Sequence, residues 1–184
     1  MSSNYSLMKK PIFILLSILI GLKIEAQDKF QLYKIQFPAI GIFSSTKSLP
    51  ISTSGLSTEI SLTGKYKSIY YVGEFGHGTG LLNFDADYTV NQYNILIGKD
   101  FPLLTWIHVE TDIGIGLFVE KYKDGVTNFQ YNRSSTIGFP LKAKFRFLIK
   151  GFPVFCFGPS VNINSLATIY YFTISSEFFL RKRK

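Results

Sequence analysis

Hydrophobic and polar residues alternate with a period of two along two long stretches, residues 107–120 and 137–149. In the first, the odd positions are Ile107, Val109, Thr111, Ile113, Ile115, Leu117 and Val119, and the even positions are His108, Glu110, Asp112, Gly114, Gly116, Phe118 and Glu120. In the second, Ile137, Phe139, Leu141, Ala143, Phe145, Phe147 and Ile149 alternate with Gly138, Pro140, Lys142, Lys144, Arg146 and Leu148. This period predicts two β-strands, each with two chemically opposite faces.

Shorter stretches of the same kind bring the predicted number of strands to eight. They cover residues 30–43, 58–63, 68–75, 88–99, 107–120, 137–149, 154–163 and 166–180. The connections after the second, fourth and sixth strands are short, whereas the connections 44–55, 76–87 and 122–134 are long and polar. A two-residue turn after Ile163 would pair it with Leu166, and would pair Phe157 with Phe172 and Phe155 with Ile174. Successive hairpins predict an all-β fold, an eight-stranded antiparallel up-and-down β-barrel.

The composition agrees with one β-rich domain. The chain has 184 residues, of which 16% are aromatic and 17% charged. This length supports a substantial core, and the balance of residue types argues against disorder. Cys156 is the one cysteine, so the chain forms no internal disulfide.

The N-terminus has the pattern of a secretory signal peptide. Lys9 and Lys10 precede an apolar run over residues 11–22, and the small residue Ala26 follows. The run is too short for a helix that crosses about 30 Å of hydrocarbon, and a buried core helix is the alternative interpretation. We therefore expect residues 1–26 to be a signal peptide and residues 27–184 to form the barrel domain.

Alternation alone does not say which face is inside. A secreted lipocalin-like soluble barrel would bury the apolar face, whereas a transmembrane barrel turns it towards lipid. Small residues crowd the polar face, which suits a narrow interior, and the longer strands reach the about 9–11 residues needed to cross a membrane. Tyrosine and tryptophan also gather near predicted strand ends, as in an interfacial girdle, at Tyr33, Tyr88, Trp106, Tyr122, Tyr131 and Tyr170. These features favour the transmembrane barrel.

The transmembrane arrangement assigns roles to both faces. The residues expected to face lipid are Ile107, Val109, Ile113, Ile115, Leu117, Phe139, Leu141, Phe145, Phe147, Phe155, Phe157, Phe172 and Ile174. The residues expected to form a charge network in the lumen are Glu110, Asp112, His108, Lys142, Lys144, Arg146 and Glu177. Lys34, Glu59 and Glu74 are expected to share the interior with them. Side chains fill the interior of an eight-stranded barrel, so a salt-bridged plug is favoured over a selective pore or proton path.

The signal ending in Ala26 and Gln27, the alternating strands and the segment Ile-Gly-Phe-Pro-Leu-Lys over residues 137–142 resemble the small outer-membrane β-barrel proteins of Bacteroidetes-type bacteria. The plan is similar to the eight-stranded OmpX and OmpA barrels. The resemblance implies a bacterial outer-membrane location, contact with outer-membrane lipid and assembly by the barrel-assembly machinery. That machinery reads a terminal aromatic strand, here Phe178 and Phe179, although the basic tail 181–184 follows it. The implied role is structural, or a surface interaction through the long loops.

Catalysis has less support in the sequence. Deacylase barrels that modify lipid A have a His-x-Ser motif. In this chain, neither His77 nor His108 is followed two residues later by a serine. Thr79 beside His77 is a conceivable nucleophile in a glycine-rich loop. The alternative to a structural role is thus a lipid-handling barrel, enzymatic or not, and we expect no enzyme activity, no metal site and no cofactor.

The net charge of +8 raises the question of an anionic partner. Four of the positive charges are the terminal residues 181–184. An exported chain does not meet nucleic acid, so we expect no nucleic-acid partner and interpret the tail as solvated.

The signal-peptide pattern predicts cleavage after Ala26. The mature protein should begin at Gln27, because the apolar run and the small residue together form a signal-peptidase site. The intact mass of the protein extracted from membranes checks this, and a mass that still includes residues 11–22 would contradict it.

Overall fold

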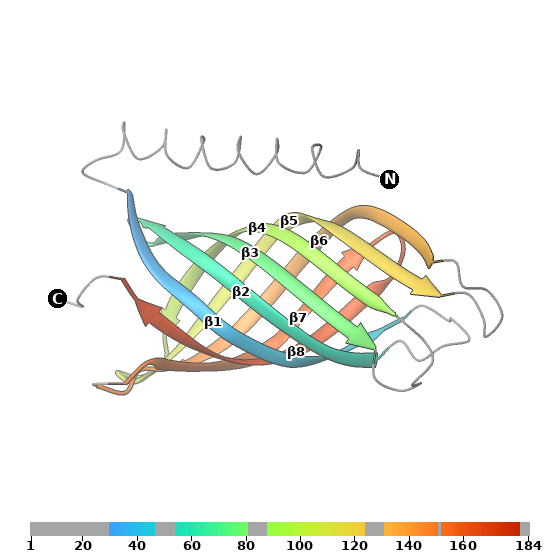
Figure 1. The fold of residues 1–184 in the computed structure, drawn as a ribbon. Helices are drawn as coiled ribbons and strands as arrows, with labels where there is room; N and C mark the ends of the chain where they lie inside the picture. The colour runs from blue at the N-terminus through green and yellow to red at the C-terminus, as the bar shows by residue number, and fades with distance from the viewer. Residues whose placement is uncertain (1–29, 47–53, 81–87, 124–130, 151, 181–184) are drawn as a thin grey trace. The chain divides into compact units, whose positions relative to one another are not determined.

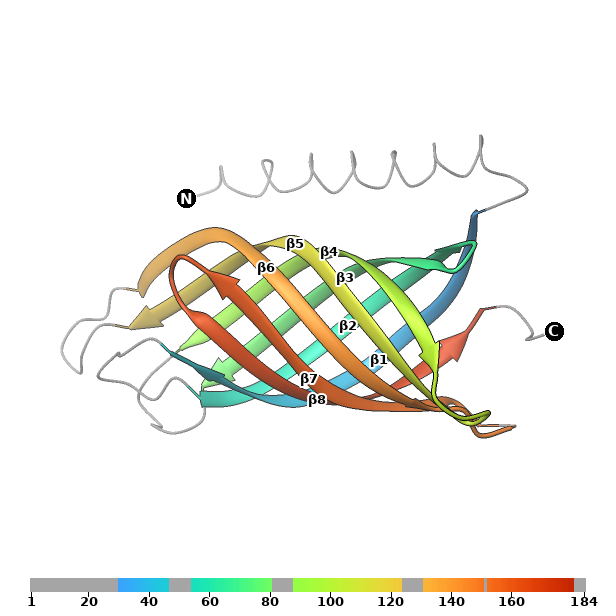
Figure 2. The same ribbon diagram turned by 180° about the vertical axis from the view of Figure 1, so that it is seen from behind.

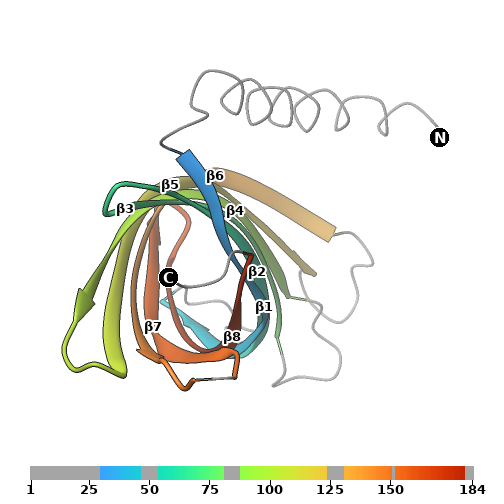
Figure 3. The same cartoon turned by 90° about the vertical axis from the view of Figure 1, so that its left-hand side faces the viewer.

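A computed structural model of the chain describes residues 30–46, 54–80, 88–123, 131–150 and 152–180. The expected signal peptide and most of the long connections lie outside these residues. The strands are β1 (Phe30–Ser45), β2 (Ser54–Tyr66), β3 (Ile69–Gly80), β4 (Thr89–Pro102), β5 (Ile107–Lys123), β6 (Tyr131–Phe147), β7 (Val154–Asn164) and β8 (Thr168–Phe179). They form a closed antiparallel barrel in sequence order (Figures 1 and 2), and β8 pairs with β1 to close the ring (Figure 3). The all-β barrel expected from the alternation is confirmed.

The two ends of the barrel differ in the length of their connections. We call the end where β1, β3 and β5 finish the loop end, because the segments 47–53, 81–87 and 124–130 follow those strands. The opposite end, where β2, β4 and β6 finish, is the turn end.

The described residues contain no helix of the length and hydropathy that a membrane span needs.

The strands reach further towards the loop end than the sequence predicts. Residues 44–45 belong to β1, 54–55 to β2, 76–80 to β3, 122–123 to β5 and 131–134 to β6, so these parts of the expected loops are wrong. The largest change is in the glycine-rich segment 76–80, which pairs with β2 on one side and β4 on the other. Backbone pairing needs no apolar side chain, so the loss of hydrophobic alternation did not mark the end of the strand.

The register of the last hairpin also differs from the prediction. Ile163 pairs with Thr168, Phe157 with Ile174 and Phe155 with Ser176, two residues away from the expected partners. The Asn164 side-chain oxygen accepts hydrogen bonds from the backbone N–H groups of Leu166 and Ala167, and so widens the turn. A shift of two residues keeps every side chain on its face, so the assignment of faces survives.

Burial alternates along the strands, with charged and polar residues inside and large apolar residues outside. Ile42, Ile113 and Ile137, for example, are each more than half exposed to the surroundings of the barrel. Inside the loop end lies an aromatic cluster made of Phe43, Tyr88, Val90, Phe118, Ala167, Ile169 and Tyr171. A smaller cluster of Tyr70, Val72 and Leu96 lines the wall formed by β3 and β4.

The expected tyrosine girdle is partly wrong. Trp106 and Tyr170 are half exposed on the outside, in agreement with the prediction. Tyr88 is buried in the loop-end cluster, Tyr122 packs against that cluster, and Tyr33 stacks on Tyr70 with ring centroids 5.4 Å apart. A tyrosine near a strand end can belong to an outer girdle or can cap the interior. Tyr88 and Tyr122 cap the interior because they continue the inward positions of Val90 and Glu120. The side chain of Tyr131 lies outside the described part of the structure.

Gly158 marks a point where β7 approaches β6 closely. A Cβ atom placed there would lie 1.9 Å from the backbone oxygen of Ala143, whereas a Cβ at Gly73 would meet nothing within 4 Å. Gly158→Ala should therefore lower the free energy of unfolding by about 1–3 kcal/mol through overpacking. The matched change Gly73→Ala should be neutral or stabilising by about 0.5–1 kcal/mol. Urea unfolding of both variants refolded in detergent measures this, and equal effects would contradict the close approach.

Candidate functional site

Ion pairs fill the middle of the barrel interior. Lys34, Lys144 and Arg146 contact Glu110 and Glu177, and these side chains are essentially buried. The Lys144 Nζ atom lies 2.6 Å from Glu110 Oε1, the Lys34 Nζ atom 2.6 Å from Glu177 Oε1, and the Arg146 Nη2 atom 2.8 Å from Glu177 Oε2. We call these five residues the Glu110 cluster. Sequence reasoning placed all five in the interior, Lys34 on β1 together with the four members on β5, β6 and β8.

The Glu110 cluster joins opposite walls of the barrel. Lys34 belongs to β1 and also contacts Glu110 on β5, and three strands separate β1 from β5 in either direction around the ring. The Lys144 ammonium in addition donates a hydrogen bond to Gln36 on β1, over 3.2 Å. These contacts cross the interior and block it.

Lys142 departs from the expected pairing. Its register partner on β5 is Asp112, but its ammonium group lies 2.7 Å from Glu59 on β2 and also contacts Glu74 on β3. Asp112 lies 3.5 Å from Lys144 instead. A long side chain on β6 reaches across a narrow interior, so the backbone neighbour is not the charge partner. The cation Lys142 thereby holds two carboxylates in place.

Polar amides surround the Lys142 contacts. The Asn94 amide donates to Glu74 over 2.9 Å, and the Asn162 amide donates to Gln92 over 3.1 Å. Buried charges are tolerable when they are paired and hydrogen-bonded, and costly when they are not. The arrangement is therefore a closed polar core rather than an open channel.

Asp100 is a network member that sequence reasoning missed. Its carboxylate lies 2.9 Å from Arg146 and 2.6 Å from the Nδ1 atom of His108. His108, expected in the network, thus joins it through Asp100 at the turn end of the barrel. The predicted fourth strand ends at Lys99, just before Asp100, whereas β4 continues to Pro102. The signal was present, because Asp100 continues the inward parity of Asn94 and Gly98.

The residues expected to face lipid all lie on the outward face. Exposed positions are Ile113, Ile115, Leu117, Phe139, Leu141, Phe145, Phe155, Phe172 and Ile174. Ile107, Val109, Phe147 and Phe157 are half-buried. The last two are partly covered by other outward aromatics, since Phe157 stacks on Phe147 with centroids 5.5 Å apart. These residues make most of the outer wall apolar.

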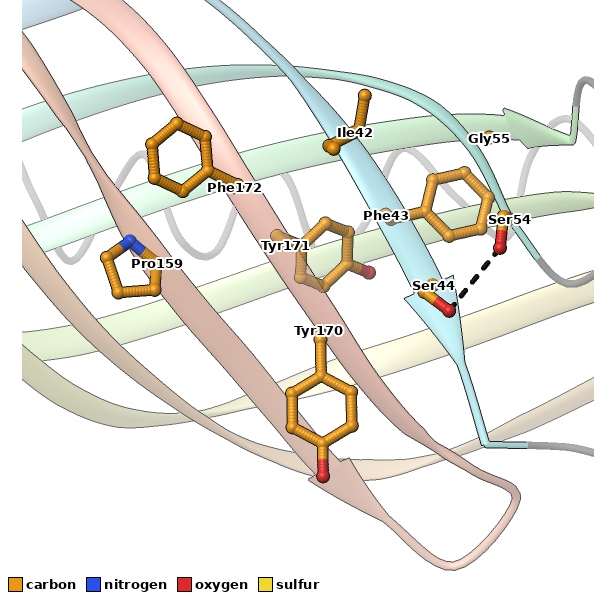
Figure 4. A pocket seen from close by; sticks show the side chains of 9 residues that line it. All are labelled: Ile42, Phe43, Ser44, Ser54, Gly55, Pro159, Tyr170, Tyr171 and Phe172. Atoms are coloured by element: carbon orange, nitrogen blue, oxygen red, sulfur yellow. Dashed lines mark hydrogen bonds between the residues drawn. The ribbon is translucent and has the colours of Figure 1, made fainter.

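A groove of about 530 Å³ runs along the wall near the loop end, between β1, β2, β7 and β8 (Figure 4). Its lining is Ile42, Phe43, Ser44, Ser54, Gly55, Pro159, Tyr170, Tyr171 and Phe172. The Ser54 hydroxyl donates to the Ser44 hydroxyl over 3.3 Å at one edge. None of these lining residues is charged, so the groove offers no acid or base.

The sequence predicts a loop around His77, and this is wrong. His77 lies on the outward face of β3. Its Nδ1 atom is 2.8 Å from Asn91 Oδ1 on β4, and its Nε2 atom is 3.2 Å from Thr79 Oγ1. Sequence reasoning paired His77 with Thr79 but missed Asn91, which the β3–β4 register places directly opposite His77. In the described residues, no group of three or more His, Cys, Asp or Glu could hold a metal ion.

The interior network predicts a non-additive response to charge removal. Lys144→Met should destabilise the protein by about 3–5 kcal/mol, because Glu110 and Asp112 lose a buried partner. Adding Glu110→Gln should recover part of that loss, since it removes the orphaned charge. Unfolding in detergent measures both, with Lys99→Met on the exposed outer wall as the control. Strictly additive losses would argue against the contact.

Solved structures with this fold are small bacterial outer-membrane proteins. The crystal structure of Neisserial surface protein A matches with a TM-score of 0.68 at 11% sequence identity, over 82% of this chain and 98% of that chain. Ail, the attachment invasion locus protein of Yersinia pestis, matches with a TM-score of 0.52 at 13% identity, over 80% of this chain and 100% of that chain. A second Ail structure, in complex with the heparin analogue sucrose octasulfate, gives a TM-score of 0.51. No protein-family model and no curated protein matches the chain. The chain has the fold of the small eight-stranded outer-membrane β-barrels.

Proposed function

We propose that the chain is an integral outer-membrane barrel with a closed interior, which acts through its outer wall and its loops. The observation that carries this is the separation of charge and apolar surface. The described acidic residues all lie on the inward face, namely Glu59, Glu74, Asp100, Glu110, Asp112, Glu120 and Glu177. Isoleucine, leucine and phenylalanine cover the outside.

This separation favours a membrane over water. A soluble protein seldom exposes an apolar patch larger than a few hundred Å², whereas here the apolar residues surround the barrel. The lipocalin-like alternative would need these residues inside and the ion pairs in water. The reverse arrangement supports contact with outer-membrane lipid, which is the first partner we propose.

The closed interior supports a role other than conduction. Ion pairs from β1 to β5 and from β6 to β2 cross the interior, and the loop-end aromatic cluster lies in it beyond them. A pore for ions or solutes needs a water-filled path, and buried paired charges leave no room for one. We therefore propose a structural or surface-interaction role.

The finer parts of the proposal concern origin and partners. The terminal strand β8 ends on the aromatic Phe179, which supports assembly by the barrel-assembly machinery. Loops at the loop end would contact a surface ligand, and the heparin analogue in the Ail structure belongs to that protein alone. The Bacteroidetes-type origin rests on the sequence resemblance. Nucleic acid and cofactors have no part in this proposal.

The outward assignment predicts a depth-dependent cost of charge. Ile113→Arg or Phe145→Arg should cost roughly 2–4 kcal/mol near the membrane midplane, while Ile113→Leu and Phe145→Leu should cost much less. Unfolding of the protein reconstituted in lipid vesicles measures this. A soluble barrel would also suffer from Arg in its core, so the deciding measurement is solubility. Residues 27–184 should need detergent or lipid to fold, and a monodisperse β-rich species in plain buffer would defeat the proposal.

The closed interior makes a separate prediction. The reconstituted protein should give no large, stable single-channel currents in a planar bilayer, because the crossing ion pairs exclude a water column. Steady conductance from the unsubstituted protein would overturn the closed interior without affecting the membrane location.

A further inference from the structure

We propose that Thr79, His77 and Asn91 form an acyl-ester hydrolysis site on the outer wall of the barrel. Its substrate class is an ester-linked acyl chain of a phosphorylated membrane lipid. The inference rests on the proposed membrane location and goes beyond the structural role, because it assigns chemistry to the wall itself.

The three side chains stand in the order nucleophile, base and orienting group. The Asn91 side-chain oxygen can only accept, so the Nδ1 atom of His77 must carry the proton and donate it over 2.8 Å. That tautomer leaves a lone pair on Nε2, which faces the Thr79 hydroxyl at 3.2 Å. A hydroxyl within reach of a base that a third group orients is the general arrangement for nucleophilic catalysis. The hydrogen bonds thus fix the imidazole in the state that removes a proton from Thr79.

Strand pairing holds this geometry. His77 and Thr79 point to the same side of β3 because they are two residues apart, and Asn91 is the direct partner of His77 on β4. Both strands are paired on their other edges, β3 with β2 and β4 with β5. A site built on the interior of a sheet keeps its side chains in position better than a site on a loop.

The height of the site along the barrel matches the position of a lipid ester. On the outward face of β3, the apolar Phe75 comes first, then His77, then Thr79, one residue before the strand ends at Gly80. Phe75 contacts Tyr93 on β4, with ring centroids 5.2 Å apart, and both are exposed. The site therefore lies where the apolar wall gives way to the polar loop end. Ester carbonyls of membrane lipids lie at this same boundary, between the acyl chains and the headgroups.

Two cations at the same height on the outer wall, Lys121 two strands from Thr79 and Arg133 three strands from it, indicate an anionic ligand. Thr89, the partner of Thr79, pairs with Lys121 on β5, and Lys121 pairs with Arg133 on β6. Both cations are exposed on the outward face, and like charges directly opposite each other destabilise a strand pair. The described carboxylates all lie on the inward face, so none of them is a partner for these cations on the outer wall. A lipid phosphate between Lys121 and Arg133 would relieve the repulsion and would hold the lipid beside Thr79.

The chemistry needs water as its one co-reactant. The Thr79 Oγ attacks the ester carbonyl carbon while His77 Nε2 takes the hydroxyl proton. The C–O bond to the alcohol then breaks, the alcohol oxygen takes that proton, and the acyl group remains on Thr79. Water, deprotonated by His77, attacks the acyl-threonine, releases the fatty acid and restores the Thr79 hydroxyl. Asn91 contacts His77 and not the substrate, so it is a positioning residue.

The test uses the full chain in vesicles of phosphatidylethanolamine and phosphatidylglycerol, with a second arm that contains lipopolysaccharide. Release of fatty acid in one arm identifies glycerophospholipid or lipid A as the source of the ester. Thr79→Val and His77→Ala should each lower the rate by about a hundredfold or more. Thr79→Ser should retain activity, because it keeps the hydroxyl. Thr111→Val is the matched control, because Thr111 is an exposed threonine on the outward face of β5, near the turn end and remote from His77, and it should leave the rate unchanged.

Two further readouts separate a catalytic site from a merely structural one. A long-chain fluorophosphonate should label Thr79 covalently, as peptide mass spectrometry detects, and the label should be absent in His77→Ala. Lys121→Gln should raise KM for a phospholipid and leave kcat nearly unchanged, because Lys121 binds the headgroup.

Flotation with the vesicles and the slower gel migration on heating show that each variant is inserted and folded, so failure of the membrane location is distinguishable from failure of this site. An inserted, folded protein that releases no fatty acid in either arm would overturn the proposal. Equal rates for Thr79→Val and the unsubstituted protein would overturn it as well.

Discussion

The ion pairs that cross the interior are the interaction on which the rest of the structure depends. Lys34, Lys144 and Arg146 place three cations inside a barrel whose outside is apolar, and each has carboxylate partners on other strands. A buried charge without a partner costs several kcal/mol, so the pairs stabilise the barrel mainly by avoiding that penalty. They also explain why the wall can be so apolar. The described carboxylates lie inside, where cations neutralise them, and the outside is left largely to apolar residues.

Because of this division, the inner and outer faces differ in what they can offer to a ligand. The cations of the interior already contact its carboxylates, so this network has little free charge to offer an incoming ligand. The outer wall is mostly inert hydrocarbon, and polar groups on it stand out for that reason. Asn91, His77 and Thr79 form such a group at the loop end, close to Lys121 in the strand register.

Much of the fold could be predicted from alternation, because the period of two assigns each side chain to a face whatever the exact register. That is why Glu110, Lys144 and Glu177 were assigned to the interior, and why the shift in the last hairpin moved no residue to the other face. The charge partners across the interior could not be predicted from alternation. The contact of Lys142 with Glu59 depends on the stagger of strands around the ring, which alternation does not encode. Strand ends were also missed where glycine replaced apolar residues, and this hid the pairing of His77 with Asn91.

The contact between Lys34 and Glu177 joins the first strand to the last. While the chain is being made and threaded, Lys34 is present from the start, but Glu177 and the closing edge of β8 arrive only when nearly the whole sequence has been delivered. A sheet of seven strands would hold Lys34 without one of its anions and would expose two unpaired edges. Partial rings are therefore poor end products, and the barrel favours its completed form through its charges as well as through its hydrogen bonds. The buried charge of Lys34 on the first strand is thus fully paired only when the last strand is in place.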